Sequence, residues 1–122
     1  MKSIDKNTRQ INLEHLYALA EGDKGFVREM IEYYLGQVPT VIQDMQRYQS
    51  AKDWQELGEL AHKAKSSFKF MGIQQLTEDA RHLEEICRAH PSERLIEPII
   101  ERIGALMVVS SEELRQELVN LS

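Results

Sequence analysis

His62, Lys65 and Lys69 combine a nucleophile with two cations at helical spacing. Residues 53–72 are predicted to form a helix, in which successive residues turn by about 100°. Measured from Leu57 on the apolar side, His62 lies about 140° around this helix, and the two lysines lie at about 80° and 120°. The three side chains therefore share one solvent-facing flank. A neutral imidazole is a nucleophile, and ammonium groups beside it would neutralise an incoming anion, so the pattern indicates chemistry on a phosphoryl group.

The same stretch carries the apolar residues that would hold this helix against a hydrophobic core. They recur every three or four residues, as expected for one helical face. They are Trp54, Leu57, Ala61, Ala64, Phe68 and Met71. Asp53 followed by Glu56 resembles a capping box at the start of the helix, and Gly72 suits a left-handed end. This pattern predicts a helix that keeps His62 on its outer face.

The other periodic segments are also predicted to be helices, because none alternates in the way that is typical of a strand. They cover about residues 12–20, 24–48, 73–90 and 93–118. Asp23 is the expected N-cap of the second helix, in which Pro39 predicts a kink or a local break. Pro98 and the Ser110–Ser111 pair suggest a bend or interruption in the last helix. We therefore predict a single all-α domain over residues 1–122, an antiparallel four-helix bundle with a short additional N-terminal helix.

The bulk composition describes an ordinary soluble domain. Of the 122 residues, 42% are hydrophobic and 29% are charged, and the net charge of −5 argues against a nucleic-acid partner. The lone Cys87 cannot form an internal disulfide, which fits a reducing compartment. Residues 1–7 lack the apolar core of a secretion signal, and the longest apolar run, residues 105–109, is too short to span a membrane. A cytoplasmic protein without a membrane partner is expected.

The residues around His62 distinguish it from the other histidines, which we interpret as incidental surface residues. These are His15, His82 and His90. Gly58 and Ser66 lie one helical turn before and after His62, on its side of the helix. Their small side chains would let the backbone of another protein approach the imidazole closely.

Taken together, these residues resemble the signature of histidine-containing phosphotransfer (HPt) domains. The matching motif is Ala61-His62-x-x-Lys65-Ser66-Ser67, with Gly72 ten residues after the histidine. The flanking segments are also similar to the family: residues 26–35 followed by Pro39, Asp53-Trp54 before the motif, and residues 82–85 after it. The resemblance spans residues 13–88. Ser66 is a departure, since the family most often has glycine there.

The resemblance implies an intermediate of a multistep phosphorelay. A receiver domain carrying a phospho-aspartate would dock on the bundle, Nε2 of His62 would attack phosphorus, and the phosphohistidine would donate to another receiver aspartate. No nucleotide, cofactor or metal ion is implied for this chain, since Mg²⁺ would belong to the receiver. The sequence also lacks a phosphate-binding glycine loop and a kinase signature, so no ATP-dependent kinase activity is expected. Lys65 and Lys69 would neutralise charge in the transition state.

The surface around His62 is predicted to bind the receiver. On the third helix, Gln55, Gly58 and Ser66 are the expected partner-binding residues. On the fourth helix, Arg81, Glu84 and Arg88 fall together at about 80–140° from the apolar stripe. Arg88 is assigned to this surface, whereas Arg81 and Glu84 are interpreted first as members of a solvated face with helical charge pairing. In the first helix, Leu13, Leu16 and Tyr17 could add apolar contacts.

Two functions of other classes compete with this prediction. Glu59-x-x-His62 and Asp79-x-x-His82 echo the ligand motif of dimetal four-helix bundles, but such ligands must point inward. Glu59 and His62 are expected on the side opposite Leu57, which excludes that metal core. A passive helical adaptor without phosphoryl chemistry is the other alternative. If the chain is a module excised from a hybrid sensor kinase, its protein context differs but the expected phosphotransfer chemistry is the same.

Overall fold

The chain folds into five α-helices. The computed structural model describes residues 9–121, and all regular secondary structure within this range is helical. The helices are α1 (Glu14–Ala20), α2 (Lys24–Ser50), α3 (Trp54–Phe70), α4 (Gln74–Ala89) and α5 (Glu93–Leu121). The prediction of an all-α protein is therefore confirmed. Residues 1–7, for which no signal sequence was expected, lie outside the described part of the chain.

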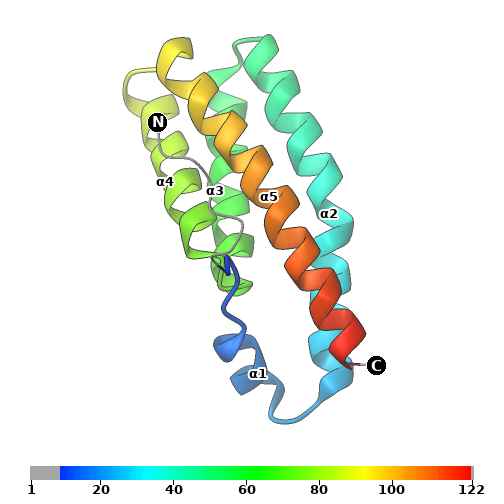
Figure 1. Ribbon diagram of the computed structural model, residues 1–122. Helices are drawn as coiled ribbons and strands as arrows, with labels where there is room; N and C mark the ends of the chain where they lie inside the picture. Colours follow the sequence, from blue (N-terminus) through cyan, green and yellow to red (C-terminus); the bar gives the residue numbers. More distant parts are fainter. Residues whose placement is uncertain (1–8, 122) are drawn as a thin grey trace.

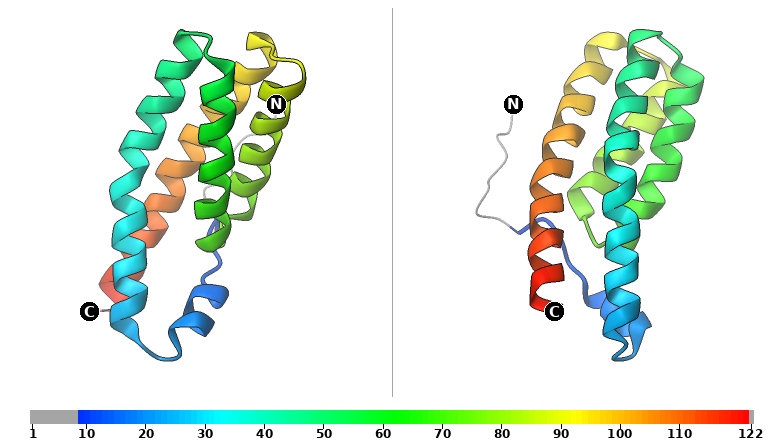
Figure 2. Two further views of the ribbon diagram at one scale, coloured as in Figure 1. Left: turned by 180° about the vertical axis from the view of Figure 1, so that it is seen from behind. Right: turned by 90° about the vertical axis from the view of Figure 1, so that its right-hand side faces the viewer.

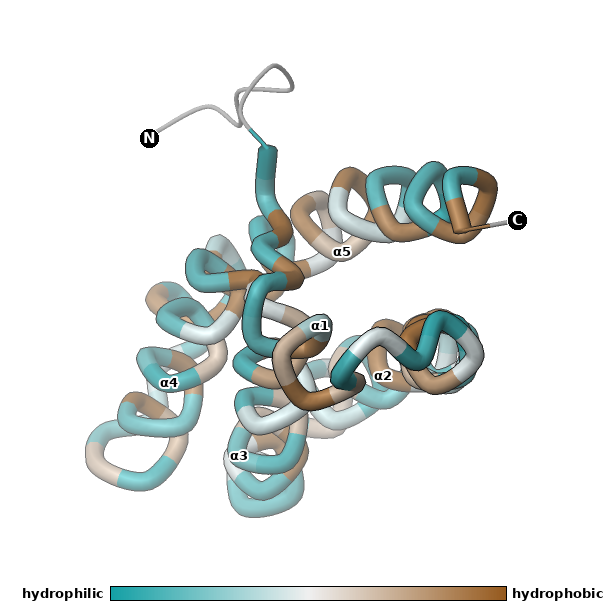
Figure 3. Tube along the Cα trace, turned by 90° about the horizontal axis from the view of Figure 1, so that it is seen from below, coloured by the Kyte–Doolittle hydropathy of each residue, from teal (hydrophilic) through white to brown (hydrophobic). Residues whose placement is uncertain are grey.

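The four long helices lie side by side, and each runs opposite to the one before it in the chain (Figures 1 and 2). α3 contacts both α2 and α4, and α5 contacts the other sides of α2 and α4, which closes the bundle. The short α1 lies at the end of the bundle where α2 begins, as Figure 3 shows from below. This arrangement leaves the outer flanks of α3 and α4 adjacent to each other and open to solvent.

One hydrophobic core holds the helices together. The apolar face expected for α3 is buried at Leu57, Ala61 and Phe68, none of which is more than 1% exposed. Across from it, α4 contributes Leu76 and Leu83, which are fully buried. Burying side chains of this size stabilises the fold by about 1.5–3 kcal/mol each, before the loss of conformational entropy is counted. The orientation of α3, and hence of His62, follows from this packing.

Side-chain caps fix where α2 and α3 begin. The carboxylate of Asp23 accepts a hydrogen bond from the backbone N–H of Phe26 at 3.0 Å. Asp53 does the same for Glu56 at 3.3 Å. Both residues therefore satisfy backbone donors that a helix leaves unpaired at its start, as their positions in the sequence predicted.

Gly72 ends α3 with a positive φ of 67°, as predicted. The N–H of Gly72 donates to the carbonyl of Lys69, and the N–H of Ile73 donates to that of Phe68, which is the Schellman arrangement. The carbonyl of Gly72 then accepts the N–H of Asn12 at 2.9 Å. The turn between α3 and α4 is thereby joined to the segment that leads into α1.

The helices are not broken at the three positions where an interruption was considered, whereas a kink or bend at these positions stays a prediction. α2 is continuous through Pro39, and α5 is continuous through Pro98 and the Ser110–Ser111 pair. A proline removes one hydrogen bond of a helix that here has more than 25 residues and extensive packing, so the helix is not interrupted. The hydroxyl of the buried Ser110 donates to the carbonyl of Leu106 at 2.7 Å, which keeps the helix intact.

The first helix also differs from the expectation. It begins at Glu14, and Leu13 and Leu16 lie in the core, where they cannot contact a partner. Tyr17 is 38% exposed, and its hydroxyl donates a hydrogen bond to Glu117 of α5. Within residues 9–121, no helix is long and apolar enough to cross a bilayer.

Candidate functional site

His62 projects from the outer flank of α3. Its side chain is 56% exposed, while Ala61 beside it is fully buried. The imidazole is nevertheless held in place, because Nδ1 lies 2.8 Å from Oε2 of Glu84 on α4. One ring nitrogen thus faces the protein, which leaves Nε2 as the nitrogen open to a partner.

Glu84 is the centre of a four-residue ionic cluster. This carboxylate is only 7% exposed and bridges α3 and α4. Its Oε1 accepts a hydrogen bond from Nζ of Lys65 at 2.9 Å, and its Oε2 forms an ion pair with Nη1 of Arg88 at 2.9 Å. With His62, three side chains converge on one acidic group. A buried carboxylate requires such partners, since an unpaired one would be strongly destabilising.

The cluster determines which nitrogen of His62 carries the proton. Burial raises the pKa of Glu84, but the hydrogen bonds from Lys65 and His62 and the charges of Lys65 and Arg88 outweigh it, so this pKa lies below its usual value. Glu84 is therefore ionised near neutral pH and can only accept hydrogen bonds. The proton of the neutral imidazole must then be on Nδ1, and the lone pair is on Nε2. The carboxylate would also stabilise positive charge that develops on the ring.

The two predicted lysines have different surroundings. Lys65 is only 28% exposed and is bonded to Glu84, which keeps its ammonium group beside the imidazole. Lys69 is exposed and forms no ion pair within residues 9–121. It lies seven residues after His62 on nearly the same face, which places it about 10 Å further along the helix axis.

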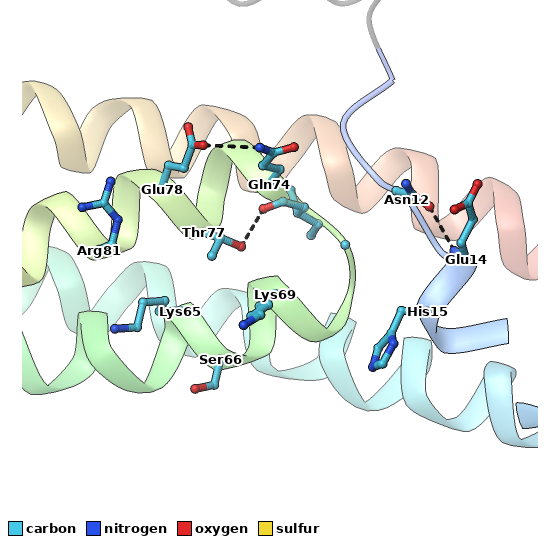
Figure 4. Close-up of a pocket in the computed structure, with 12 residues that line it drawn as sticks. Asn12, Glu14, His15, Lys65, Ser66, Lys69, Gln74, Thr77, Glu78 and Arg81 are labelled. Carbon is cyan, nitrogen blue, oxygen red and sulfur yellow. Dashed lines mark hydrogen bonds between the residues drawn. The ribbon is translucent and has the colours of Figure 1, made fainter. Parts of the chain in front are cut away.

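A groove of about 700 Å³ lies along this flank (Figure 4). One wall is the last part of α3, with Lys65, Ser66 and Lys69, and the other is the first half of α4. The segment around the start of α1 closes one end. The other lining residues are Gly72 and Ile73 of the α3–α4 turn, Gln74, Thr77, Glu78 and Arg81 of α4, and Asn12, Glu14 and His15 around the start of α1. The groove begins within one helical turn of His62.

The other predicted binding residues are not all at the surface. Gln55 and Ser66 are exposed on α3, and Arg88 is exposed on α4 beside Glu84. Gly58, however, is buried, so its expected place on the exposed flank was wrong. A Cβ atom at Gly58 would lie 3.1 Å from Cβ of Cys87 on α4. Glycine thus leaves room for the close approach of α3 to α4, and a bulky residue at this position would press on α4 as well as on a docked partner.

Glu84 is the functional residue whose role was missed from the sequence. Its position about 80° from Leu76 indicated a solvated face, and its spacing from Arg88 indicated only a helical charge pair. The contact with His62 depends on how α4 is rotated against α3, which no local pattern reports. Arg81 does behave as interpreted, since it pairs with the exposed Glu85 at 2.8 Å.

The residues of the dimetal alternative are not arranged around a common centre. Glu59 and His82 are exposed, whereas Asp79 pairs with Arg102 of α5 at 3.0 Å. Across residues 9–121, no group of three or more histidine, cysteine, aspartate or glutamate residues could hold a metal ion.

Comparison with protein families identifies a family for this chain. The Hpt domain family matches residues 29–122, which is most of the chain and includes every residue of the ionic cluster. No curated protein and no solved structure matches the chain. Hpt domains have a phosphotransfer-related role in phosphorelays, where they interact with receiver domains. Because the match covers more than half of the sequence, the chain belongs to the Hpt domain family.

Proposed function

We propose that His62 accepts a phosphoryl group from the phospho-aspartate of one receiver domain and passes it to an aspartate of another. The observation that carries this proposal is the exposed imidazole whose Nδ1 is bonded to an ionised, buried Glu84. This bond leaves the lone pair of Nε2 directed away from Glu84, available to an incoming phosphorus atom.

The transfer needs no external reactant. The Nε2 lone pair forms the new P–N bond while the P–O bond to the receiver aspartate breaks, and that bonding pair leaves with the carboxylate. The Nδ1 proton stays in place, and Glu84 stabilises the positive charge of the phosphorylated ring. The second step runs in reverse onto another aspartate. Positioning of the groups supplies much of the rate, as in other phosphoryl transfers.

Lys65 and Arg88 support the same step electrostatically. Both are held within hydrogen-bonding distance of Glu84, and Glu84 contacts His62, so two cations flank the nucleophile. A phosphoryl group brings between one and two negative charges near neutral pH. The positive charges of Lys65 and Arg88 therefore offset the repulsion between the carboxylate of Glu84 and the incoming phosphoryl group. No nucleotide takes part in this scheme, and the Mg²⁺ that such transfers use belongs to the receiver.

The test is phosphotransfer to His62→Gln, with His82→Gln as the matched control. His82 is an exposed histidine on α4 that has no ion pair within residues 9–121, so the same substitution there leaves the cluster intact. Radiolabelled receivers should label the wild type and His82→Gln equally, and His62→Gln should take up no acid-labile phosphate. Helical circular dichroism should be the same for all three.

Two results would contradict the proposal. Label retained on His62→Gln would place the phosphorylation site elsewhere. Receivers that bind the wild type without ever labelling it would identify the chain as a passive adaptor.

A further inference from the structure

The groove beside His62 combines an open volume with an uneven distribution of charge. Figure 4 shows Lys65 and Lys69 lying between α3 and α4, whereas the carboxylates of Glu14 and Glu78 point away from this space. The interior is therefore more basic than the full set of lining residues suggests.

Within the groove, Lys69 is the cation available to a partner. The ammonium of Lys65 is bonded to Glu84, and the guanidinium of Arg81 is bonded to Glu85. Lys69 has no such partner within the described residues and is exposed. Its position about 10 Å along the helix from His62 suits contact with a docked protein better than contact with the transferred phosphoryl group. The docking role inferred for Lys69 therefore replaces the transition-state role expected of it from the sequence.

We propose that this groove receives an acidic surface segment of the receiver domain, and that Lys69 is the residue that selects it. The inference rests on the proposed transfer through His62. Two observations identify the occupant as the receiver. The groove is continuous with the site of transfer, since Lys65 and Ser66 line it. Its interior charge is complementary to acidic side chains, which promotes association and excludes partners with basic surfaces at the same place.

The assignment separates docking from chemistry. A cation that contacts only the docked receiver stabilises the bound complex and the transition state equally, so its loss raises the half-saturating concentration and leaves the maximal rate unchanged. A cation that contacts the phosphoryl group in the transition state lowers the maximal rate when it is lost. The two roles of Lys69 are thus distinguishable by kinetics.

The experiment uses a receiver domain that phosphorylates wild-type His62, identified first by transfer profiling. Single-turnover transfer is then measured against receiver concentration for the wild type, Lys69→Glu and the control Arg94→Glu. Arg94 is an exposed cation in the first turn of α5, at the opposite end of α4 from the groove (Figure 1). The control therefore changes the net charge equally and does not touch the groove.

We expect Lys69→Glu to raise the half-saturating concentration by about tenfold, with the maximal rate within about threefold of the wild type. Arg94→Glu should alter neither value by more than about twofold. Reversing an acidic residue of the receiver to lysine should restore tight docking to Lys69→Glu.

The outcomes distinguish the two proposals. If no receiver labels wild-type His62, the proposed function fails. If transfer occurs but Lys69→Glu saturates like the wild type, or if both variants weaken equally, the groove is not the docking site. A loss of maximal rate alone would place Lys69 at the phosphoryl group. If Lys69→Glu changed only self-association in sedimentation, a second copy of the chain would be the occupant.

Discussion

In the proposed transfer, Glu84 is a carboxylate that does not itself react but holds the groups around the nucleophile. Glu84 fixes the imidazole of His62, and it also holds Lys65 and Arg88 beside that ring. A lone exposed histidine would sample several rotamers and both neutral tautomers. The bond to Glu84 selects one tautomer and restricts the ring, which lowers the entropy that must be lost during transfer.

Replacing Glu84 with glutamine is expected to slow phosphorylation of His62 by about tenfold or more. The amide keeps the size of the side chain but loses the negative charge that selects the tautomer and stabilises the phosphorylated ring. The measurement is the maximal single-turnover rate from a receiver, with circular dichroism as the check on folding. An unchanged maximal rate would show that Glu84 is structural only.

The same substitution is also expected to lower stability in a way that depends on pH. Folding lowers the pKa of Glu84 from its ordinary value of 4.5. The contribution of Glu84 to the free energy of unfolding is therefore fully present above pH 4.5. The contribution is lost as the pH falls through the folded-state pKa. Urea unfolding should show the wild type more stable than Glu84→Gln at pH 7, by roughly 1.5–3 kcal/mol, with the gap closing below pH 4.5. A gap that stayed constant with pH would contradict this assignment.

At the scale of the helices, sequence periodicity predicted the face of α3 correctly because burial dominates helix orientation. Leu57, Ala61 and Phe68 are buried in the hydrophobic core. Because His62 lies on another face of the same helix, their burial places its side chain at the solvent-facing surface. The caps at Asp23 and Asp53 were also predictable, since they satisfy donors a few residues away. Gly58 was placed wrongly because it carries no apolar signal, although it allows the close approach of two helices.

The turn at Gly72 gives an element-scale prediction. Replacing Gly72 with alanine should destabilise the protein by at least about 2 kcal/mol, because φ is 67° and the new Cβ would collide with the backbone of Asn12. The exposed Gly36 within α2 is the matched control. A Cβ there meets nothing within 4 Å, so Gly36→Ala should stabilise by about 0.5–1 kcal/mol. Chemical denaturation measures both, and equal effects would contradict the argument.

At the scale of the whole molecule, residues about 100 positions apart meet at the N-terminal segment. The backbone N–H groups of Gln10 and Ile11 donate to the carboxylate of Glu113 on α5 at 2.8 and 3.1 Å. The next residue, Asn12, bonds to the turn after α3. The segment thus joins α5 to the α3–α4 turn. Local sequence patterns do not report contacts of this kind, so neither this segment nor the contact of Glu84 with His62 was predictable.

Glu113→Ala is therefore expected to lower the free energy of unfolding by about 1–2 kcal/mol, since it leaves two partly buried N–H groups without their charged acceptor. Glu112→Ala is the control, because Glu112 is 72% exposed and, among residues 9–121, its ion pair is with the exposed Arg115. Its loss should change stability by less than about 0.5 kcal/mol. Thermal unfolding of the two variants measures both effects. Equal losses of stability in Glu113→Ala and Glu112→Ala would contradict the role given to Glu113.

The junction of Gly72 with Asn12 also limits where this chain can be lengthened. The carbonyl of Gly72 is already bonded and its Cα faces the backbone of Asn12, so an inserted residue would disrupt both helices and the groove at once. The turn between α2 and α3 differs, because Ala51 and Lys52 are exposed and lie at the other end of α3. A fluorescent label, an affinity tag or new chain termini should therefore be tolerated at residues 51–52 and not at residue 72.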